Sequence, residues 1–136
     1  MTTIKVREVV DTNVLIYSLD EYSPAKQIVA KQLLIDAPVI SSQNLSELLN
    51  VLTKRWKYPK QKAMQTTNTL LGTCRYVPTG RGTIQHAFAL VDRYDVQLFD
   101  SLIVAALEAG CTTLYSEDMQ HGLLVENQLR ILNPFR

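Results

Sequence analysis

The sequence has little of the covalent or metal chemistry that cross-links small proteins. Only two of its 136 residues are cysteine, Cys74 and Cys111, and they lack the short spacing of metal-binding pairs. Both lie in apolar or strand-like stretches, so we expect buried, reduced thiols, with a single disulfide as the alternative. Because the chain also offers no combined set of histidine and cysteine ligands, we expect no zinc site.

Long apolar runs are missing as well. No stretch approaches the roughly 20 apolar residues that cross a bilayer, and the opening MTTIKVREVV lacks a basic segment followed by an apolar run. We therefore expect a cytoplasmic protein without a signal peptide or a membrane partner. The sequence has no internal repeat, low-complexity tract or linker, and its length suits a single domain over residues 1–136.

An excess of charge of either sign is absent too. The chain has 14 basic and 13 acidic side chains, a formal net charge of +1, so as a whole it does not attract nucleic acid. Any binding of nucleic acid must therefore come from a local cluster of charge. The hydrophobic fraction of 46 % is ordinary for a globular protein and argues against disorder.

Helix-like and strand-like patterns alternate along the chain. Strands are predicted where β-branched or apolar residues cluster, at 4–10, 38–40, 75–77, 112–115 and 129–132. Helices are predicted at 14–19, from Pro24 past Leu33, and from Ser42 until Pro59 breaks the helix. Further helices are predicted after Pro59 up to Gly72, around 84–94, and from Asp100 to Gly110. This alternation predicts a three-layer α/β domain, in which a parallel sheet of about five strands is flanked by helices.

Apolar faces are apparent on several of these helices. One face of the second helix carries Ala25, Ile28, Val29 and Leu33, the third carries Leu45, Leu48, Leu49, Leu52 and Trp56, and the fifth carries Ile84, Ala87, Phe88, Val91 and Tyr94. The helix after Asp100 is almost wholly apolar, so we expect it to be central.

Four acidic residues occupy positions where an α/β sheet binds ligands. Such sheets bind them beyond the carboxyl ends of their strands, and Asp11 ends the first strand while Asp118 follows the fourth. Asp100 opens the apolar helix. Glu47 falls nearly opposite the leucine stripe of its helix, at about 100° per residue, so it belongs to no obvious core face.

Each acid also has a purely structural explanation. Asp100 fits a helix N-cap, Asp118 fits a turn, and Glu47 fits a solvated helix position. Asp11 is hardest to explain in this way, because an acid between an apolar strand and a helix occupies a ligand-binding position. Clustered carboxylates repel unless a cation compensates, and their oxygens suit Mg²⁺ or Mn²⁺, which can activate water for phosphodiester hydrolysis.

Four segments resemble, in order and approximate spacing, the signatures of the PIN-domain nucleases, specifically the VapC-type toxins of bacterial toxin–antitoxin pairs. They are VVDTNVLIY (9–17), NLSELLNVL (44–52), LFDSLIVAAL (98–107) and LYSEDMQHG (114–122). The resemblance covers essentially the whole chain and implies a PIN-like fold. It also implies a metal-dependent endoribonuclease, a cognate antitoxin protein that covers the site, and a homodimer.

The resemblance assigns roles to particular residues. It implies that the catalytic and metal-binding acids are Asp11, Glu47, Asp100 and Asp118, the last often acting through water. It implies that the polar residues hydrogen-bonded to these carboxylates are Thr12, Asn13, Ser101 and Ser116. Glu117 departs from the pattern, since many relatives carry a basic or neutral residue there, and it either adds charge to the site or points away.

One segment, 53–62, gathers five positive charges and two aromatic residues with no acid. Through Lys54, Arg55 and Lys57 it could bind RNA phosphates, with bases stacked on its rings. The alternative is a solvated turn between helices, in which Trp56 continues the apolar stripe. The two histidines, 86 and 121, have no partner at a telling spacing, and we expect both at the surface.

Two other functions remain open from the sequence. The first is a non-catalytic domain that binds RNA or an antitoxin through the basic segment. The second is a phosphatase like the haloacid dehalogenases, whose nucleophile also follows a first strand. That chemistry requires a second aspartate two residues after the nucleophile, where this chain has Asn13.

Overall fold

The computed structural model describes residues 7–94 and 100–136. The strands are β1 (Glu8–Val10), β2 (Val39–Ser41), β3 (Arg75–Val77), β4 (Thr113–Tyr115), β5 (Leu124–Val125) and β6 (Leu129–Leu132). The helices are α1 (Thr12–Leu19), α2 (Pro24–Leu34), α3 (Ser42–Asn50), α4 (Lys60–Thr73), α5 (Arg81–Arg93) and α6 (Ser101–Glu108), with a π-helical turn η1 (Val51–Arg55) after α3. None of the helices within these two ranges is long and apolar enough to cross a membrane.

The strands form one six-stranded sheet in the order β3-β2-β1-β4-β6-β5. Five strands run parallel, which confirms the predicted parallel sheet, and β5 pairs antiparallel with β6 at one edge. The sequence pattern does not predict β5, because two residues are too few to show an alternation of apolar and polar side chains. The predicted first strand, 4–10, is seen as Glu8–Val10, and residues 4–6 lie outside the described ranges.

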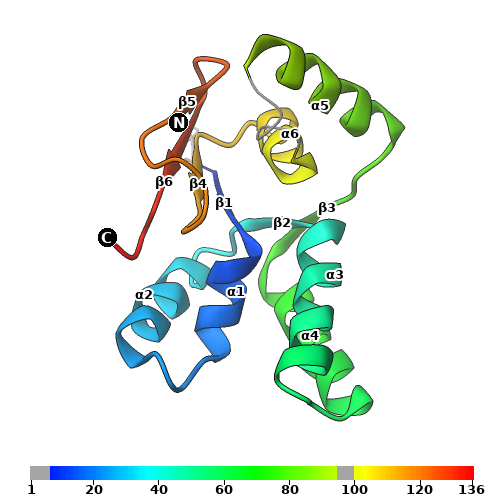
Figure 1. Ribbon diagram of the computed structural model, residues 1–136, viewed down its shortest axis with the longest axis vertical. Helices are drawn as coiled ribbons and strands as arrows, with labels where there is room; N and C mark the ends of the chain where they lie inside the picture. The colour runs from blue at the N-terminus through cyan, green and yellow to red at the C-terminus, as the bar shows by residue number, and fades with distance from the viewer. Residues whose placement is uncertain (1–6, 95–99) are drawn as a thin grey trace, which may run out of the picture.

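Helices cover both faces of the sheet, which confirms the three-layer α/β architecture (Figure 1). Successive strand residues point to opposite faces, so Val9 is buried with α5 and α6, whereas Val10 is buried with α1 to α4. The two cysteines follow this division, since Cys111 lies in the first core and Cys74 in the second. Both thiols are free and buried, as the sequence predicts, and burial raises the pKa of Cys74 to about 11.

Two predicted apolar surfaces are confirmed. Residues 102–106 of α6 are all buried, so this helix is central to the first core. In α3 and η1 the leucine stripe faces the second core, where Leu48 and Leu52 are fully buried and Trp56 packs against them. Because that stripe faces inward, Glu47 on the other side of α3 is exposed at the surface.

The predicted faces of α2 and α5 are partly wrong. On α2 the buried residues are Ala30 and Leu34, while Ile28 is 61 % exposed. On α5 the buried residues are Thr83, Ala87 and Leu90, whereas the predicted Phe88 and Tyr94 are exposed. The buried faces carry Ala30 and Leu34 in α2 and Ala87 and Leu90 in α5, because packing against neighbouring elements, rather than the apolar pattern along the helix, sets which face is buried.

The orientation of α2 can be tested by two substitutions on the same helix. Leu34→Ala should lower the free energy of unfolding by about 2–3 kcal/mol, because it leaves a cavity under a residue that is only 9 % exposed. Ile28→Ala should cost less than about 0.5 kcal/mol, because its side chain already contacts water. Urea unfolding followed by circular dichroism measures both, and the reverse order of costs would contradict the orientation.

Candidate active site

Asp11 lies where the central strand β1 ends and α1 begins. Its backbone N–H donates to the carbonyl of Tyr115 in the neighbouring strand β4, with an N–O distance of 2.9 Å. The side chain is the N-cap of α1, and its Oδ1 accepts the N–H of Thr12 at 2.7 Å. The carboxylate is therefore fixed at the carboxyl edge of the sheet, the position at which α/β sheets bind ligands.

Ser116 and Asp118 reach the same edge from the segment that follows β4. The buried Ser116 hydroxyl donates to Oδ2 of Asp11 at 2.8 Å and accepts the N–H groups of Asp118 at 3.2 Å and Met119 at 3.3 Å. From α1, Nδ2 of Asn13 donates to Oδ2 of Asp118 at 3.2 Å. One serine thus joins the two aspartates, although 105 positions of sequence separate it from Asp11.

Glu47 is brought to this edge by α3. The hydroxyl of Thr12 donates to Oε2 of Glu47 at 2.7 Å, and the buried Asn44 donates to the Thr12 hydroxyl at 3.2 Å. Asn44 itself is held by the capping arrangement at the start of α3, where its Oδ1 accepts the backbone N–H of Ser41 at 2.8 Å. Asn44 is not among the residues predicted for the site, because its role depends on the packing of α3 against α1.

Ser101 reaches Glu47 through an intermediate side chain. Its hydroxyl donates to Oε1 of Gln43, and Nε2 of Gln43 donates to Oε1 of Glu47 at 2.8 Å. Ser101 is predicted from the sequence to contact a carboxylate directly, and Gln43 is not among the predicted residues. Nothing in the sequence indicated this relay, because it depends on how α3 and α6 face each other.

Asp100 is the N-cap of α6, and its Oδ1 accepts the N–H of Leu102 at 2.8 Å. Asp100 is therefore both a helix cap, as the structural explanation predicted, and a residue of the candidate site. Burial raises the pKa of Asp100 to about 6; the Leu102 N–H opposes this shift. The negative charges of Asp11 and Glu47 add to it, so these three carboxylates share one electrostatic environment.

Asp11 experiences the same environment. Burial raises its pKa above the ordinary value, while the hydrogen bonds from Ser116 and Thr12 act in the opposite direction. The charges of Glu47 and Asp118 raise this pKa further. The structure thus brings all four sequence-predicted acids together at one edge of the sheet, within range of mutual repulsion.

The donor chemistry of this cluster fits a hydrated divalent cation. Its charged ligands are all carboxylate oxygens, which Mg²⁺ and Mn²⁺ prefer, and Oδ1 of Asn13 is buried without a hydrogen-bond partner. The geometry fits less closely than the chemistry does. Among residues 7–94 and 100–136, no three Asp, Glu, His or Cys side chains are close enough to hold one ion together. The residues present therefore fit such a cation by their chemistry, a set of carboxylate oxygens with a buried amide oxygen beside them.

Glu117 points away from this cluster. Its Oε2 lies 2.6 Å from Nζ of Lys26, and its Oε1 accepts the hydroxyl hydrogen of Tyr17 at 2.7 Å. The hydrogen bond from Lys26 holds the pKa of Glu117 below its ordinary value. This answers the question that the sequence left open, and it identifies Lys26 as a neighbour of the site that no sequence pattern indicated.

The basic segment lies further along the same helical axis as Glu47. Lys54 is seven residues beyond Glu47, which corresponds to roughly 10 Å at about 1.5 Å per residue. Lys54, Arg55 and Lys57 are exposed, and Lys57 adopts a left-handed conformation with φ of 57° in the turn before α4. Trp56 packs into the core, as the structural alternative predicted.

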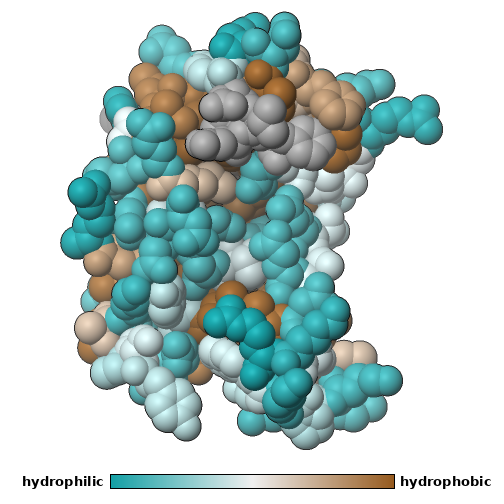
Figure 2. Space-filling model, viewed as in Figure 1, coloured by the Kyte–Doolittle hydropathy of each residue, from teal (hydrophilic) through white to brown (hydrophobic). Residues whose placement is uncertain are grey.

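Beside this turn is a groove of about 480 Å³. It is lined by Leu19, Asp20, Glu21, Tyr22, Trp56, Tyr58 and Lys62. Figure 2 shows the corresponding notch at the lower end of the molecule, between the α1–α2 side and the α3–α4 side. Its walls combine aromatic rings with charges of both signs, and Tyr22 is 98 % exposed.

The histidines take no part in the acidic cluster. Nδ1 of His86 lies 3.4 Å from Oε1 of Glu108, at the opposite end of α6 from Asp100. His121 is exposed, as predicted, and its Nδ1 accepts the N–H of Asn133 at 2.9 Å.

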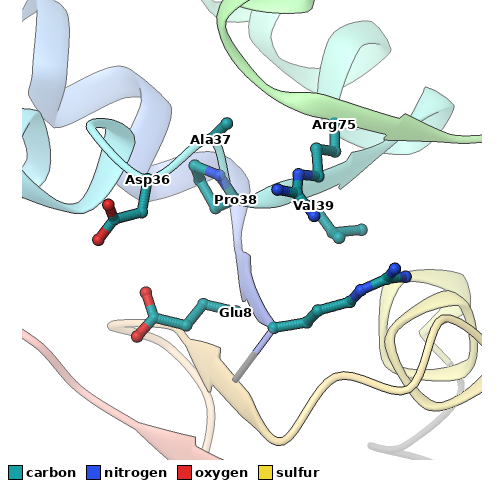
Figure 3. Close-up of a pocket in the computed structure, with 7 residues that line it drawn as sticks. Glu8, Asp36, Ala37, Pro38, Val39 and Arg75 are labelled. Carbon is teal, nitrogen blue, oxygen red and sulfur yellow. The ribbon is translucent and has the colours of Figure 1, made fainter. Parts of the chain in front are cut away.

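A separate pocket of about 230 Å³ opens at the opposite edge of the sheet, where β1, β2 and β3 begin (Figure 3). Figure 3 shows the carboxylates of Glu8 and Asp36 on one side of this pocket, while Arg75 extends toward Pro38 and Val39. None of the acids of the candidate site lines it. The pocket therefore lies away from the carboxyl edge at which the candidate site is built.

Comparison with known proteins agrees with the fold. The PIN domain family model matches residues 9–121, and the chain belongs to this family. No curated protein sequence matches the chain.

Two solved structures have a similar fold. One is a toxin–antitoxin complex from Klebsiella pneumoniae, with 21 % identity and a TM-score of 0.66, over 93 % of this chain and 97 % of that chain. The other is VapBC2 from Rickettsia felis bound to a DNA fragment from the promoter of its genes, with 14 % identity and a TM-score of 0.58, over 83 % of this chain and 89 % of that one.

The burial of Asp100 predicts how stability depends on pH in protein kept metal-free with a chelator. Its pKa of about 6 in the folded state exceeds the ordinary 3.8, so between these values the folded state binds a proton that the unfolded chain has released. Stability should therefore fall by up to about 3 kcal/mol as the pH rises from about 4 to about 6. Asp100→Asn should remove this contribution, measured by urea unfolding from pH 4 to 7.

The matched control is Asp92→Asn, which changes an exposed aspartate on α5 and should keep the wild-type dependence on pH. If Asp100→Asn also kept that dependence, the electrostatic description of the site would be wrong.

Proposed function

We propose that this protein is a Mg²⁺- or Mn²⁺-dependent endoribonuclease, the toxin of a VapC-type toxin–antitoxin pair, formed by one PIN domain over residues 1–136. The observation that supports this most is the convergence of Asp11, Glu47, Asp100 and Asp118 at the carboxyl edge of the sheet, where their charges influence each other. Membership of the PIN domain family supports nuclease chemistry for such a cluster.

In this proposal the four carboxylates hold the cation. When bound, the cation supplies an activated water and neutralises charge that develops on the scissile phosphate. The surrounding side chains orient the ligands: Ser116 holds Asp11, and Thr12 holds Glu47, supported by Asn44. Asn13 orients Asp118 through its amide N–H, and its buried Oδ1 would remain available to accept a further hydrogen bond in the site.

The proposed partners follow from the surface as well as from the similar structures. Both of these are named as toxin–antitoxin or VapBC structures, and a cognate antitoxin segment with apolar and charged side chains suits the groove beside Tyr22, Trp56 and Lys62. RNA would extend from the acids toward Lys54, Arg55 and Lys57. A cytoplasmic location and a homodimer belong to the same proposal.

Removal of Asp11 tests the proposed chemistry. Asp11→Asn keeps a side-chain oxygen that can cap α1 but loses a charged ligand, so Mn²⁺ binding and RNA cleavage should each fall more than about 100-fold. Titration calorimetry measures the first, and a gel assay of RNA cleavage in Mg²⁺ or Mn²⁺ measures the second. Asp92→Asn provides the control, because that exposed acid lies outside the cluster.

Full RNA cleavage by Asp11→Asn, or by wild type in excess EDTA, would refute the proposed mechanism. The second candidate function is a non-catalytic domain that binds RNA or an antitoxin through the basic segment, in which Lys54, Arg55 and Lys57 are exposed. RNA binding in EDTA, with no cleavage in either metal, would support it. A dehalogenase-like phosphatase has no support in the family assignment, and Asn13 stands where its second aspartate is required.

The basic segment gives an independent prediction about RNA binding. A triple variant with Lys54, Arg55 and Lys57 changed to alanine should raise the KM for RNA and leave kcat nearly unchanged, because these residues lie away from the acids. The slope of log affinity against log salt should decrease by about 0.7 for each phosphate of single-stranded RNA that the variant no longer binds. An unchanged slope would leave the solvated-turn interpretation as the better one; Lys31→Ala, an exposed lysine of α2, is the control.

A further inference from the structure

An ion pair outside the acidic cluster holds the segment that carries Asp118 of this cluster and Ser116, which is hydrogen-bonded to Asp11. Glu117 stands between Ser116 and Asp118, and its carboxylate lies 2.6 Å from Nζ of Lys26 in α2. The hydroxyl of Tyr17 in α1 donates to the other carboxylate oxygen at 2.7 Å, and Nζ of Lys26 lies 3.1 Å from that hydroxyl. The three polar groups therefore form a closed triangle of contacts.

Aromatic rings enclose this triangle. Nζ of Lys26 lies 4.6 Å from the ring centroid of Tyr17 and 5.7 Å from that of Phe135, and the two rings pack edge to face at 4.9 Å. Cation–π contacts and partial burial strengthen an ion pair beyond the small value of an exposed one. The side chains of Lys26 and Glu117 are 40 % and 26 % exposed, so both are partly shielded from water.

The contacts of the neighbouring residues extend this arrangement to the acids. On one side of Glu117, the Ser116 hydroxyl donates to Asp11. On the other, Asp118 accepts from Asn13. Glu117 itself is held to α1 and α2. All three residues of the short segment 116–118 therefore have contacts that hold them in place.

The ion pair also affects the charge around the site. Glu117 would be a fifth carboxylate beside four that already repel each other, but its charge is offset by the ammonium group at 2.6 Å. Lys26 therefore does two things at once: it fixes the orientation of the segment, and it keeps the Glu117 carboxylate directed away from the cluster.

We propose that Lys26, through Glu117, is a positioning residue of the acidic site, which holds the 116–118 segment so that Ser116 and Asp118 meet Asp11 and Asn13. This inference rests on the proposed function for its consequence, cation binding. Its structural part, the fixed orientation of the segment, stands on the contacts alone.

Two single substitutions separate orientation from charge. Lys26→Met keeps an aliphatic side chain against the rings and leaves Glu117 charged and unpaired. Glu117→Gln breaks the same ion pair and leaves the Lys26 ammonium unpaired, so the two variants change the charge beside the site in opposite directions. Lys31→Met changes an exposed lysine of the same helix and is the matched control.

Both variants should weaken Mn²⁺ binding roughly tenfold in titration calorimetry, because outer contacts that orient carboxylate ligands contribute that much to metal affinity. The exchanged pair, Lys26→Glu with Glu117→Lys, should recover most of the affinity. Weaker binding in only one of the two variants, or in neither, would overturn the proposal. A charge effect weakens cation binding in Glu117→Gln and strengthens it in Lys26→Met, whereas a lost orientation weakens it in both.

Hydrogen exchange distinguishes failure of this inference from failure of the proposed function. The N–H groups of Asp118 and Met119 donate to the Ser116 hydroxyl, so their exchange should accelerate about tenfold in both variants and stay unchanged in Lys31→Met. This measurement needs neither metal nor RNA. If wild type binds no Mn²⁺, the proposed function fails while exchange still decides the role of Lys26; wild-type exchange rates in both variants would overturn that role.

Discussion

The burial of the Asp11 carboxylate beside other negative charges is the interaction on which the rest of the site depends. A partly buried carboxylate near Glu47 and Asp118 is unfavourable unless hydrogen bonds or a cation compensate. Ser116 and the N–H of Thr12 supply the hydrogen bonds. Those contacts require β4 beside β1 and α1 directly after β1. The order of strands and helices therefore determines which hydrogen bonds the Asp11 carboxylate accepts.

The helix caps have two roles in this protein. Asp11 begins α1 and Asp100 begins α6, and each accepts a backbone N–H as an ordinary cap does. Each carboxylate also belongs to the acidic cluster. The structural explanation of these aspartates and the functional one are therefore compatible, because a cap uses one carboxylate oxygen and leaves lone pairs of the other free. Asn44 likewise has two roles, because its side-chain oxygen takes part in the cap of α3 while its amide nitrogen donates to the Thr12 hydroxyl.

A net charge of +1 conceals a strongly uneven distribution of charge. Four acids gather at the edge of the sheet, while the exposed basic residues of segment 53–62 lie in η1, in the turn after it and at the start of α4. Glu117, adjacent in sequence to Asp118, is removed from the acidic group by its pairing with Lys26. Local pairing, rather than composition, thus decides which carboxylates face a substrate or a cation.

The sequence alone determined the α/β alternation, the inward leucine stripe of α3 and the acids that follow strands, because these depend on periodicity and on neighbours along the chain. It did not determine the orientations of α2 and α5, the short strand β5, or the relay from Ser101 through Gln43. Only the tertiary structure decided the direction of Glu117, because its partner Lys26 is 91 residues away in sequence. Packing between distant elements sets such contacts, and a pattern read along one chain does not contain them.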